Sequence, residues 1–404
     1  MSSKMIVISL MVGVLFNAAP SADFFYKTGL ESNSTNSTLL AQTTSTRGKT
    51  YYVSATGNNN NNGLTKDKPF QTIQKAVDAA KAGDTVYVMN GTYTQAKGSN
   101  RIVFFYHKDG TPTAPITLKA YPGHKPILKS NNLWAILISG SSYINIEGFT
   151  LIGNKDSVTL KYAQEKKDVF NDPLAGSSGI VVTSTLVKGT KAIDRRAHHI
   201  VIRNNNISKF CSNGIGVNLS DYITIENNIV SENAWYTSQG AQGMTMLNNL
   251  NFDNNTTDYK FIIRGNVVYN NRSFIPWDGR PVITEGHGIM IDSSKQTQVD
   301  SVNIPYTGKT LISNNIVYNN GGSGIVALRS SNVDIVNNTT YQNGQSPEFA
   351  KTAGEIDAIG SSNVKVFNNI MQAKPNGLVN NVYGATKTTY SKNLVFNSTK
   401  YTGK

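Results

Sequence analysis

Two short hydrophobic patterns recur along the chain from about residue 140 onward. In the first, alternating apolar and polar residues lead into one or more asparagines and then into a second apolar stretch. Its copies end at Asn206, Asn228, Asn266, Asn315, Asn338 and Asn369. The closest copies, 206 to 228 and 315 to 338, are 22 and 23 residues apart. A repeat of this length predicts stacked units that share one core, with longer intervals marking insertions.

In the second pattern, a glycine opens a strand whose second and fourth residues are apolar, as in Gly288-Ile-Met-Ile-Asp292. The other copies start at Gly179, Gly214, Gly243 and Gly324. Alternate residues of a strand point to opposite faces, so the apolar pair should face a shared core. Together the patterns predict an all-β fold, a single-stranded right-handed parallel β-helix. We expect its asparagines to form a structural ladder, since asparagine accepts tight-bend geometry and bonds its neighbour in the next coil.

A helical pattern precedes the coils. Phe70, Ile73, Val77 and Ala80 fall on one face of a helix, and Gly83 stands where that helix would stop. A solenoid exposes its end coils, so we interpret this segment as an N-terminal capping α-helix. We divide the β-helix domain, residues 49–404, into a cap (about 49–95), coils (about 96–375) and a C-terminal cover (about 376–404). Whether the last stretch continues the coils stays open.

The first residues have the layout of a secretory signal peptide, which predicts a secreted protein. Lys4 precedes an apolar run from Met5 to about Ala19, and small residues follow up to Ala22. We therefore assign residues 1–22 to the signal peptide and the polar residues 23–48 to a disordered linker. No second long apolar segment follows, so we expect no membrane contact. Cys211 is the only cysteine, which excludes an intramolecular disulfide.

The chain carries a formal net charge of +13, spread without a long basic block. Net charge of this sign favours a polyanionic partner and leaves nucleic acid and acidic glycan both open. The composition is 39% hydrophobic and only 16% charged, with 34 glycines, as is typical of chains rich in strands and turns.

Several segments near the N-terminus resemble the start of pectate-lyase-like β-helix proteins. They are Tyr51-Tyr-Val-Ser-x-x-Gly57, Lys68-Pro-Phe-x-Thr-Ile-x-x-Ala76, Gly83-Asp-Thr-Val-Tyr-Val88 and Gly91-Thr-Tyr93. That group includes pectate lyases, alginate lyases, chondroitinase-type lyases and mannuronan epimerases. The resemblance implies an acidic polysaccharide as the partner, rather than nucleic acid, and we expect a monomer. These motifs mark the fold, so the chemistry has to be argued from a site.

The residues just before the five glycines should form one polar column on the coils: Ser178, Asn213, Gln242, His287 and Ser323. Two insertions with aromatic residues, 233–239 and 271–280, lead into the middle of that column. Aromatic loops beside a polar floor are suited to sugar rings, so we expect a substrate groove there.

β-Elimination on a uronate needs neutralisation of the carboxylate, a base for the C5 proton and an acid for the leaving oxygen. We select five catalytic candidates: His287 as base, Tyr236 as proton donor or base, Arg272 and Arg280 as carboxylate partners, and Lys260 as a reserve base beside Lys295. Five further residues are substrate-binding candidates: Trp235, Gln242, Trp277, Asn213 and Arg329. Two alternatives stay open, a structural His287 within the strand stack and tryptophans that only pack their loops.

Three acidic residues could hold Ca²⁺, namely Asp278, Glu285 and Asp292, and no other cofactor is expected. The stretch Thr284-Glu-Gly-His-Gly-Ile-Met-Ile-Asp292 resembles a strand motif of β-helix lyase-like proteins, but Glu and His replace its Asp and Asn. Our preferred function is a polysaccharide lyase acting on an alginate or pectate type of polymer. A glycoside hydrolase using Glu285 with Asp292 or Glu355 with Asp357, a C5-epimerase and a non-catalytic glycan-binding protein are the alternatives.

Overall fold

The computed structural model describes residues 48–190, 192–277, 280–294, 305–349, 351–397 and 400–401. The expected signal peptide and all but the last residue of the expected linker lie outside these ranges. None of the helices in the described ranges is long and apolar enough to cross a membrane.

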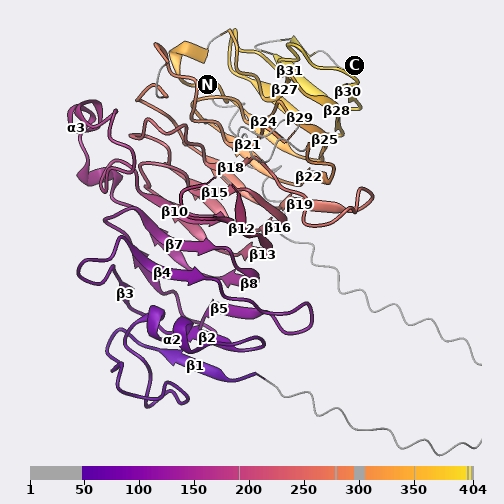
Figure 1. The fold of residues 1–404 in the computed structure, drawn as a ribbon. Coiled ribbons are helices and arrows are strands. Elements are labelled where there is room, and N and C mark those ends of the chain that lie inside the picture. The colour runs from indigo at the N-terminus through magenta and orange to yellow at the C-terminus, as the bar shows by residue number, and fades with distance from the viewer. Residues whose placement is uncertain are drawn as a thin grey trace, which may run out of the picture. The chain divides into compact units, whose positions relative to one another are not determined.

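Three sheets run along a stack of coils, which confirms the predicted parallel β-helix (Figure 1). Each regular coil gives one strand to sheet A, then one to sheet B and one to sheet C, and neighbouring coils pair in parallel.

The strands of sheet A are β1 (Thr50–Val53), β2 (Thr85–Val88), β5 (Ile116–Ala120), β8 (Ser142–Glu147), β13 (Ala197–Arg203), β16 (Ser220–Glu226), β19 (Tyr259–Arg264), β22 (Lys309–Ser313), β25 (Ser331–Val336), β28 (Ser362–Phe367) and β30 (Thr389–Ser391). Those of sheet B are β3 (Thr92–Tyr93), β6 (Ile127–Lys129), β9 (Thr150–Ile152), β14 (Asn206–Ser208), β17 (Ile229–Ser231), β20 (Val267–Tyr269), β23 (Ile316–Tyr318), β26 (Thr339–Tyr341), β29 (Ile370–Ala373), β31 (Leu394–Asn397) and β32 (Lys400–Tyr401). Sheet C contains β4 (Arg101–Tyr106), β7 (Trp134–Ser139), β10 (Ser178–Thr183), β15 (Ile215–Asn218), β18 (Met244–Leu247), β21 (Ile289–Asp292), β24 (Ile325–Leu328) and β27 (Ile356–Ile359).

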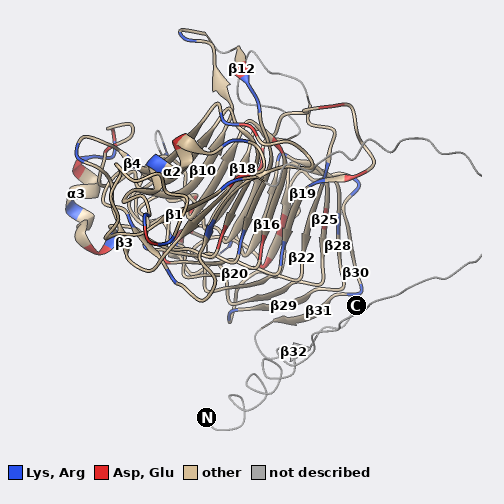
Figure 2. Ribbon diagram, turned by 90° about the horizontal axis from the view of Figure 1, so that it is seen from below, with Lys and Arg blue, Asp and Glu red and all other residues tan. Residues whose placement is uncertain are grey.

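Smaller elements decorate the stack. They are α2 (Ile73–Ala79), α3 (Leu160–Glu165), the 3-10 turns η1 (Lys155–Ser157) and η3 (Pro347–Phe349), and the antiparallel hairpin β11 (Thr185–Leu186) with β12 (Ile193–Arg195). Lys and Arg are spread over many coils (Figure 2).

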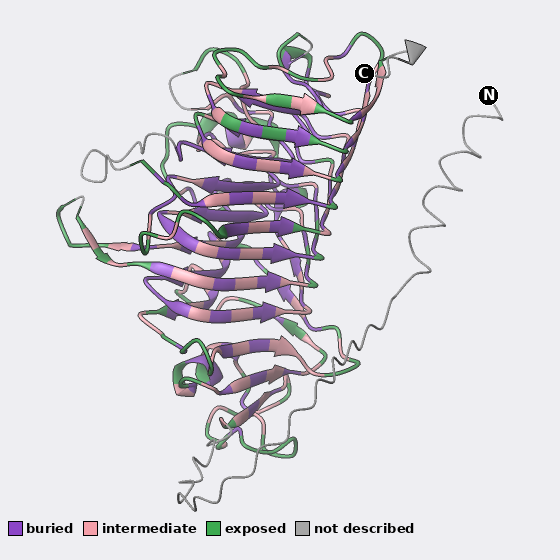
Figure 3. Ribbon diagram, turned by 90° about the vertical axis from the view of Figure 1, so that its right-hand side faces the viewer, coloured by how far each residue is buried: buried purple, intermediate pink, exposed green. Residues whose placement is uncertain are grey.

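The core follows the alternation that the glycine-opened pattern predicts. In register across sheet C, Ile180 pairs with Ile215, Ile215 with Met244, and Met244 with Ile289, and all four side chains are fully buried. Burying one such side chain contributes about 1.5–3 kcal/mol, so each coil adds to one continuous core. Buried and less buried positions alternate along the strands (Figure 3).

The predicted asparagine ladder is confirmed at the short turn between sheets A and B. Asn228 donates its backbone N–H and its Nδ2 to Oδ1 of Asn266, at 2.9 and 3.1 Å. The same pair of bonds links each member to the next through Asn205, Asn228, Asn266, Asn315, Asn338, Asn369 and Asn393. In the first copy the ladder uses Asn205, and Asn206 is exposed. The residue before each rung, such as Asn227 with φ 55°, takes the left-handed conformation that asparagine tolerates.

A second ladder, which the sequence reading missed, stands in the longer turn between sheets B and C. It runs through Asn233, Asn271, Asn320 and Asn343. It ends on the buried carboxyl of Glu355, which accepts two hydrogen bonds from Asn343. The inserted loops of the site therefore leave from rigid, hydrogen-bonded points.

The coils extend further at both ends of the stack than the sequence could establish. Strands β30 and β31 pair in parallel with β28 and β29, so the coils continue as far as Asn397. At the other end β1, β2 and β3 already belong to sheets A and B, so coils begin inside the expected cap. The cap helix α2 is confirmed, with Thr72 as its N-cap. Its Gln74 side chain hydrogen-bonds both backbone polar groups of Phe104 on edge strand β4.

Candidate functional site

The predicted polar column exists on sheet C, and hydrogen bonds join its members. Strand register aligns Ser178, Asn213, Gln242, His287 and Ser323 in successive coils. The backbone N–H of Gln242 donates to Oδ1 of Asn213 at 2.9 Å, and that of His287 donates to Oε1 of Gln242 at 2.6 Å. The N–H of Ser323 donates to Nδ1 of His287 at 2.7 Å. The column is thus a hydrogen-bonded ladder: its polar groups bond mostly to one another and hold the neighbouring residues in position.

His287 does not face an open groove, and that expectation is wrong. Its side chain is 6% exposed, and its ring lies 5.3 Å from the ring of Phe349. Burial lowers its pKa to about 4, so the imidazole is neutral near neutral pH. Gly322 lies so close that a Cβ there would approach Nδ1 to 2.5 Å. A structural role within the strand stack, the alternative that the sequence left open, fits this geometry.

Glu285 replaces His287 as the titratable group of the column. Gln242 uses its Oε1 for the N–H groups of Gly286 and His287, so its Nε2 donates to the carboxylate of Glu285. Burial, and to a smaller extent nearby Asp292, raise the pKa of Glu285, while Gln242 and Arg329 lower it, and the net result is a pKa of about 7. This carboxyl therefore titrates near neutral pH.

Asp292 and Arg329 lie on neighbouring coils of the same face. One terminal nitrogen of Arg329 lies 3.0 and 3.2 Å from the two carboxylate oxygens of Asp292. Asp292 is 7% exposed and burial raises its pKa, which Arg329 counteracts. Half of the Arg329 side chain is exposed, so its remaining N–H groups can reach a substrate anion.

Trp277 and Arg280 join this group through the inserted loop. The Arg280 guanidinium lies 5.2 Å from the ring centroid of Trp277. A Cβ on Gly240 would come within 3.4 Å of the indole and 3.7 Å of the Glu285 carboxyl carbon, so both border the same glycine. Asn213 is partly exposed beside Gln242. We define the Glu285 site as Gln242, Glu285, Asp292, Arg329 and Trp277.

The calcium site stays a prediction. Asp278 lies outside the described residues, while Glu285 and Asp292 come within electrostatic range of each other. No group of three or more His, Cys, Asp or Glu side chains that could hold a metal occurs in the part of the chain that the structure describes.

Trp235 and Arg272 line a different cleft, of about 500 Å³, although the backbone of Arg272 lies against Gly286. Its lining residues are Glu232, Trp235, Asn270, Arg272, Phe274, Asn319, Gln342 and Gln345. Several of these directly follow sheet B strands, so the cleft lies at the sheet B end of the inserted loops. Nε of Arg272 donates to Ser346 at 3.2 Å, and Lys155 lies 3.8 Å from the centre of the Trp235 ring.

Tyr236 is also separate from Glu285. Its ring packs against a small apolar cluster that includes Cys211 and Ile275, and against Phe274 at 6.4 Å. Its proposed part in proton transfer has no counterpart in these contacts. Tyr236 lies away from Glu285 because the aromatic residues of the inserted loops, Trp235, Tyr236 and Phe274, pack against one another.

Lys260 cannot serve as the reserve base that the sequence suggested. Its side chain has no exposed surface, and its ammonium lies 3.0 Å from Asp221 and 2.7 Å from Asp253. Both of these carboxylates form ion pairs with it, and the group has no path to a substrate on sheet C. Lys295, named with it, lies outside the described residues.

The second hydrolase pair, Glu355 and Asp357, is inside the molecule. These residues are 1% and 0% exposed, and burial raises their pKa values to about 8 and 7. Asp357 accepts hydrogen bonds from Gly354 and Asn381, and Glu355 ends the second ladder. Neither carboxyl can bind a sugar there, so this pairing is wrong.

Sequence reasoning considered Glu285 as a metal ligand or hydrolase carboxyl and did not identify its link to Gln242. The available signal was its place two residues before His287 in the aligned column. The interpretation of Gln242 as a substrate ligand also changes, since its amide is used to orient Glu285.

Comparison with known proteins gives the following matches. The profile of the family described as "Pel9A-like, right handed beta helix region" matches residues 51–363. "Pectate lyase PEL9" of Emericella nidulans is 42% identical over 82 residues, 20% of this chain and 18% of that protein. "Uncharacterized protein YwoF" of Bacillus subtilis is 28% identical over 162 residues, 39% of this chain and 28% of that protein. These alignments span less than a third of either relative.

A solved structure shows the same type of architecture. The A-module of mannuronan C-5 epimerase AlgE4 from Azotobacter vinelandii is 15% identical, with 81% of this chain and 83% of that chain covered and a TM-score of 0.50. Pectate lyase Pel9A is also 15% identical, with 83% and 78% covered and a TM-score of 0.47. At this identity the likeness concerns the fold alone.

Proposed function

Because the chain belongs to the family of Pel9A-like right-handed β-helix proteins, we propose that it is a secreted polysaccharide lyase. The substrate is a uronic-acid-containing polymer of the pectate or alginate type, cleaved by β-elimination. The observation that carries the proposal is the Glu285 carboxyl, whose pKa is raised to about 7, within electrostatic range of a half-exposed Arg329. A partial relative is named a pectate lyase, which agrees with the choice of reaction.

In this mechanism the carboxylate of Glu285 removes the C5 proton of a uronate unit. The electron pair left at C5 forms the C4=C5 double bond, the bond from C4 to the glycosidic oxygen breaks, and the leaving oxygen takes up a proton. Arg329 uses one nitrogen on Asp292 and offers the others to the substrate carboxylate, which makes the C5 proton more acidic. Gln242 holds the base in place, because its Nε2 donates to Glu285 while its Oε1 accepts from the N–H of His287.

The test measures the ultraviolet absorbance of the new double bond on pectate, alginate and glycosaminoglycans. We expect Glu285→Gln to lower kcat at least about 100-fold, the usual share of a positioned base. Glu348→Gln, an exposed acid on η3, is the matched control and should keep full activity. The same assay with EDTA reports on the predicted calcium site. If Glu285→Gln remains fully active on a substrate that the protein cleaves, Glu285 is not the base.

The pH profile is the second arm of this prediction. A base acts when deprotonated, so kcat/KM should rise as pH increases through about 7, the pKa of Glu285, and then level off. The rise should be absent from the residual activity of Glu285→Gln.

A glycoside hydrolase is the second candidate, favoured by Asp292 within electrostatic range of Glu285. Here Glu285 would act as the acid, and activity would fall above pH 7. New reducing ends without absorbance of a double bond would select this reaction over elimination.

A further inference from the structure

The N-terminal end of sheet C carries a cation among aromatic side chains. On edge strand β4, Val103 and Phe105 are fully buried, so Phe104 and Tyr106 project to the outer face. The half-buried Arg101, at the start of the strand, reaches Phe104 with its guanidinium. The guanidinium carbon of Arg101 lies 3.9 Å from the centre of the Phe104 ring, which lies 5.2 Å from the ring of Tyr106. Tyr106 is 53% exposed. We call Arg101, Phe104 and Tyr106 the β4 platform.

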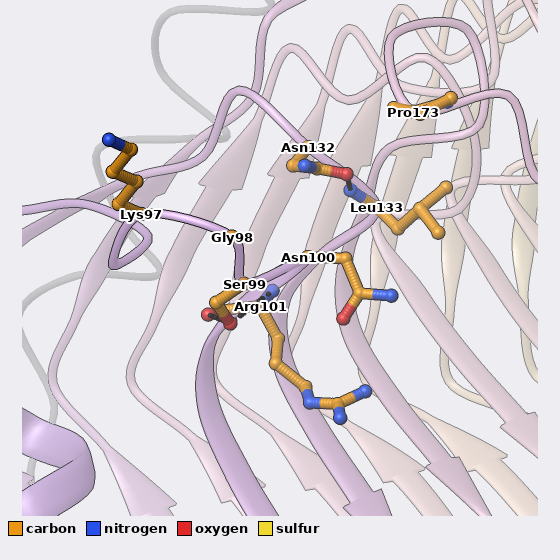
Figure 4. Close-up of a pocket in the computed structure, with 8 residues that line it drawn as sticks. All are labelled: Lys97, Gly98, Ser99, Asn100, Arg101, Asn132, Leu133 and Pro173. Carbon is orange, nitrogen blue, oxygen red and sulfur yellow. Dashed lines mark hydrogen bonds between the residues drawn. The ribbon is translucent and has the colours of Figure 1, made fainter.

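A cavity of about 730 Å³ adjoins this platform. It is lined by Lys97, Gly98, Ser99, Asn100, Arg101, Asn132, Leu133 and Pro173, with no acidic side chain among them (Figure 4). In Figure 4 the Arg101 side chain extends along the strands, away from the loop that carries Lys97. Neither cation has an ion pair with another described residue. Asp172, the acid beside Pro173, is buried and accepts hydrogen bonds from Tyr162 and from backbone N–H groups.

Strand register connects the β4 platform to the Glu285 site. Arg101 aligns with Trp134 and Trp134 with Ser178, which belongs to the same column as Asn213 and Gln242. Four strand spacings therefore separate Arg101 from Gln242, or about 19 Å at 4.7–4.9 Å per strand. A polysaccharide lying along sheet C can contact both places at once.

We propose that the β4 platform is a remote subsite that binds an anionic sugar residue of the substrate chain. Arg101 pairs with the sugar carboxylate, since its guanidinium has no ion pair among the described residues and its fork of N–H groups matches the two carboxylate oxygens. Phe104 and Tyr106 present ring surface to the apolar face of a sugar. The inference takes the class of substrate from the proposed function. It adds Arg101 as a binding residue, and it requires a substrate chain long enough to reach from the Glu285 site to the β4 platform.

The experiment measures binding without turnover, by calorimetry, with Glu285→Gln as the background protein. The ligands are polygalacturonate, alginate, the trisaccharide of each and a neutral polysaccharide. Arg101→Ala should weaken binding of the preferred acidic polymer about tenfold, the loss expected for one charge-assisted contact, and leave trisaccharide binding unchanged. Arg101→Lys should fall in between. Lys129→Ala removes one positive charge from sheet B and should have no such effect.

Three outcomes separate this inference from the proposed function. A length-dependent loss in Arg101→Ala alone supports the subsite. Polymer binding equal to that of the background protein overturns the subsite, even where lyase activity and its dependence on Glu285 are established. A length-dependent loss without elimination on any substrate supports an anionic-glycan subsite and rejects the lyase.

Discussion

At the scale of single residues, the structure sorts the charged candidates by their burial and partners. Lys260 has no exposed side-chain surface and pairs with Asp221 and Asp253, whereas Arg329 pairs with Asp292 through one nitrogen and has half of its side chain exposed. Residue type alone made Lys260 a candidate for catalysis and Arg329 a candidate for substrate binding. The distinction follows from desolvation, because a charge without exposed surface needs protein partners and cannot also serve a ligand.

Replacing Lys260 with methionine should destabilise the fold. The change leaves Asp221 buried without its cation, with only neutral donors: the Tyr306 hydroxyl at 2.7 Å and the backbone N–H groups of Tyr222 and Phe252. Breaking one side of a buried pair costs about 3–5 kcal/mol, so the free energy of unfolding in urea should fall by that amount. The exposed Lys129→Met is the control. A decrease in the free energy of unfolding of less than about 1 kcal/mol would show that the pair is hydrated and contradict its burial.

At the scale of elements, two asparagine ladders hold the turns on either side of sheet B. The short turn carries the longer ladder, and the second ladder fixes the points from which the site loops leave. Each rung satisfies backbone and side-chain groups that no water reaches, so the ladders make the turns rigid.

Asn266 is a suitable rung to remove. Its Nδ2 donates to the carbonyls of Ile225 and Arg264, and its Oδ1 accepts from Asn228. We expect Asn266→Ala to lower the free energy of unfolding by about 3 kcal/mol, since several buried groups lose their partner. Asn131→Ala, at an exposed position, serves as the reference in the same thermal or urea unfolding series. Equal stabilities of the two variants would contradict a structural role for the ladder.

At the scale of the whole molecule, stacking turns a repeat into a long face. Strands from eight coils form sheet C, and one aligned column runs from Arg101 to Ser323. The net charge of +13 attracts a polyanion, and this attraction extends over the length of such a face.

Binding of the acidic polymer should therefore depend on ionic strength. Raising the salt from about 0.1 M to 1 M shortens the Debye length from about 10 to 3 Å, which screens all but the direct contacts. We expect the Kd of the polymer to rise at least about tenfold in that range, measured by calorimetry. A neutral polysaccharide of equal length is the comparison, and an unchanged Kd for the acidic polymer would limit recognition to contacts other than charge.

The amino-acid sequence by itself determined the all-β coil repeat, the cap helix, the asparagine ladder of the short turn and the existence of the polar column. These features depend on periods that can be read locally. Side chains alternate every second residue along a strand, and the coil length repeats where no insertion interrupts it. Asn228 and Asn266 could be matched although an insertion separates them, because each stands between an alternating strand pattern and a second apolar stretch.

Only the tertiary structure decided how the column is used. Glu285, Gln242 and His287 form one hydrogen-bonded unit, in which the imidazole is enclosed and the carboxyl is left to titrate. The inserted loops place Trp277 beside Glu285 and fold Trp235 and Tyr236 elsewhere. Burial and partner choice depend on contacts between coils of unequal length, and no local pattern records those contacts.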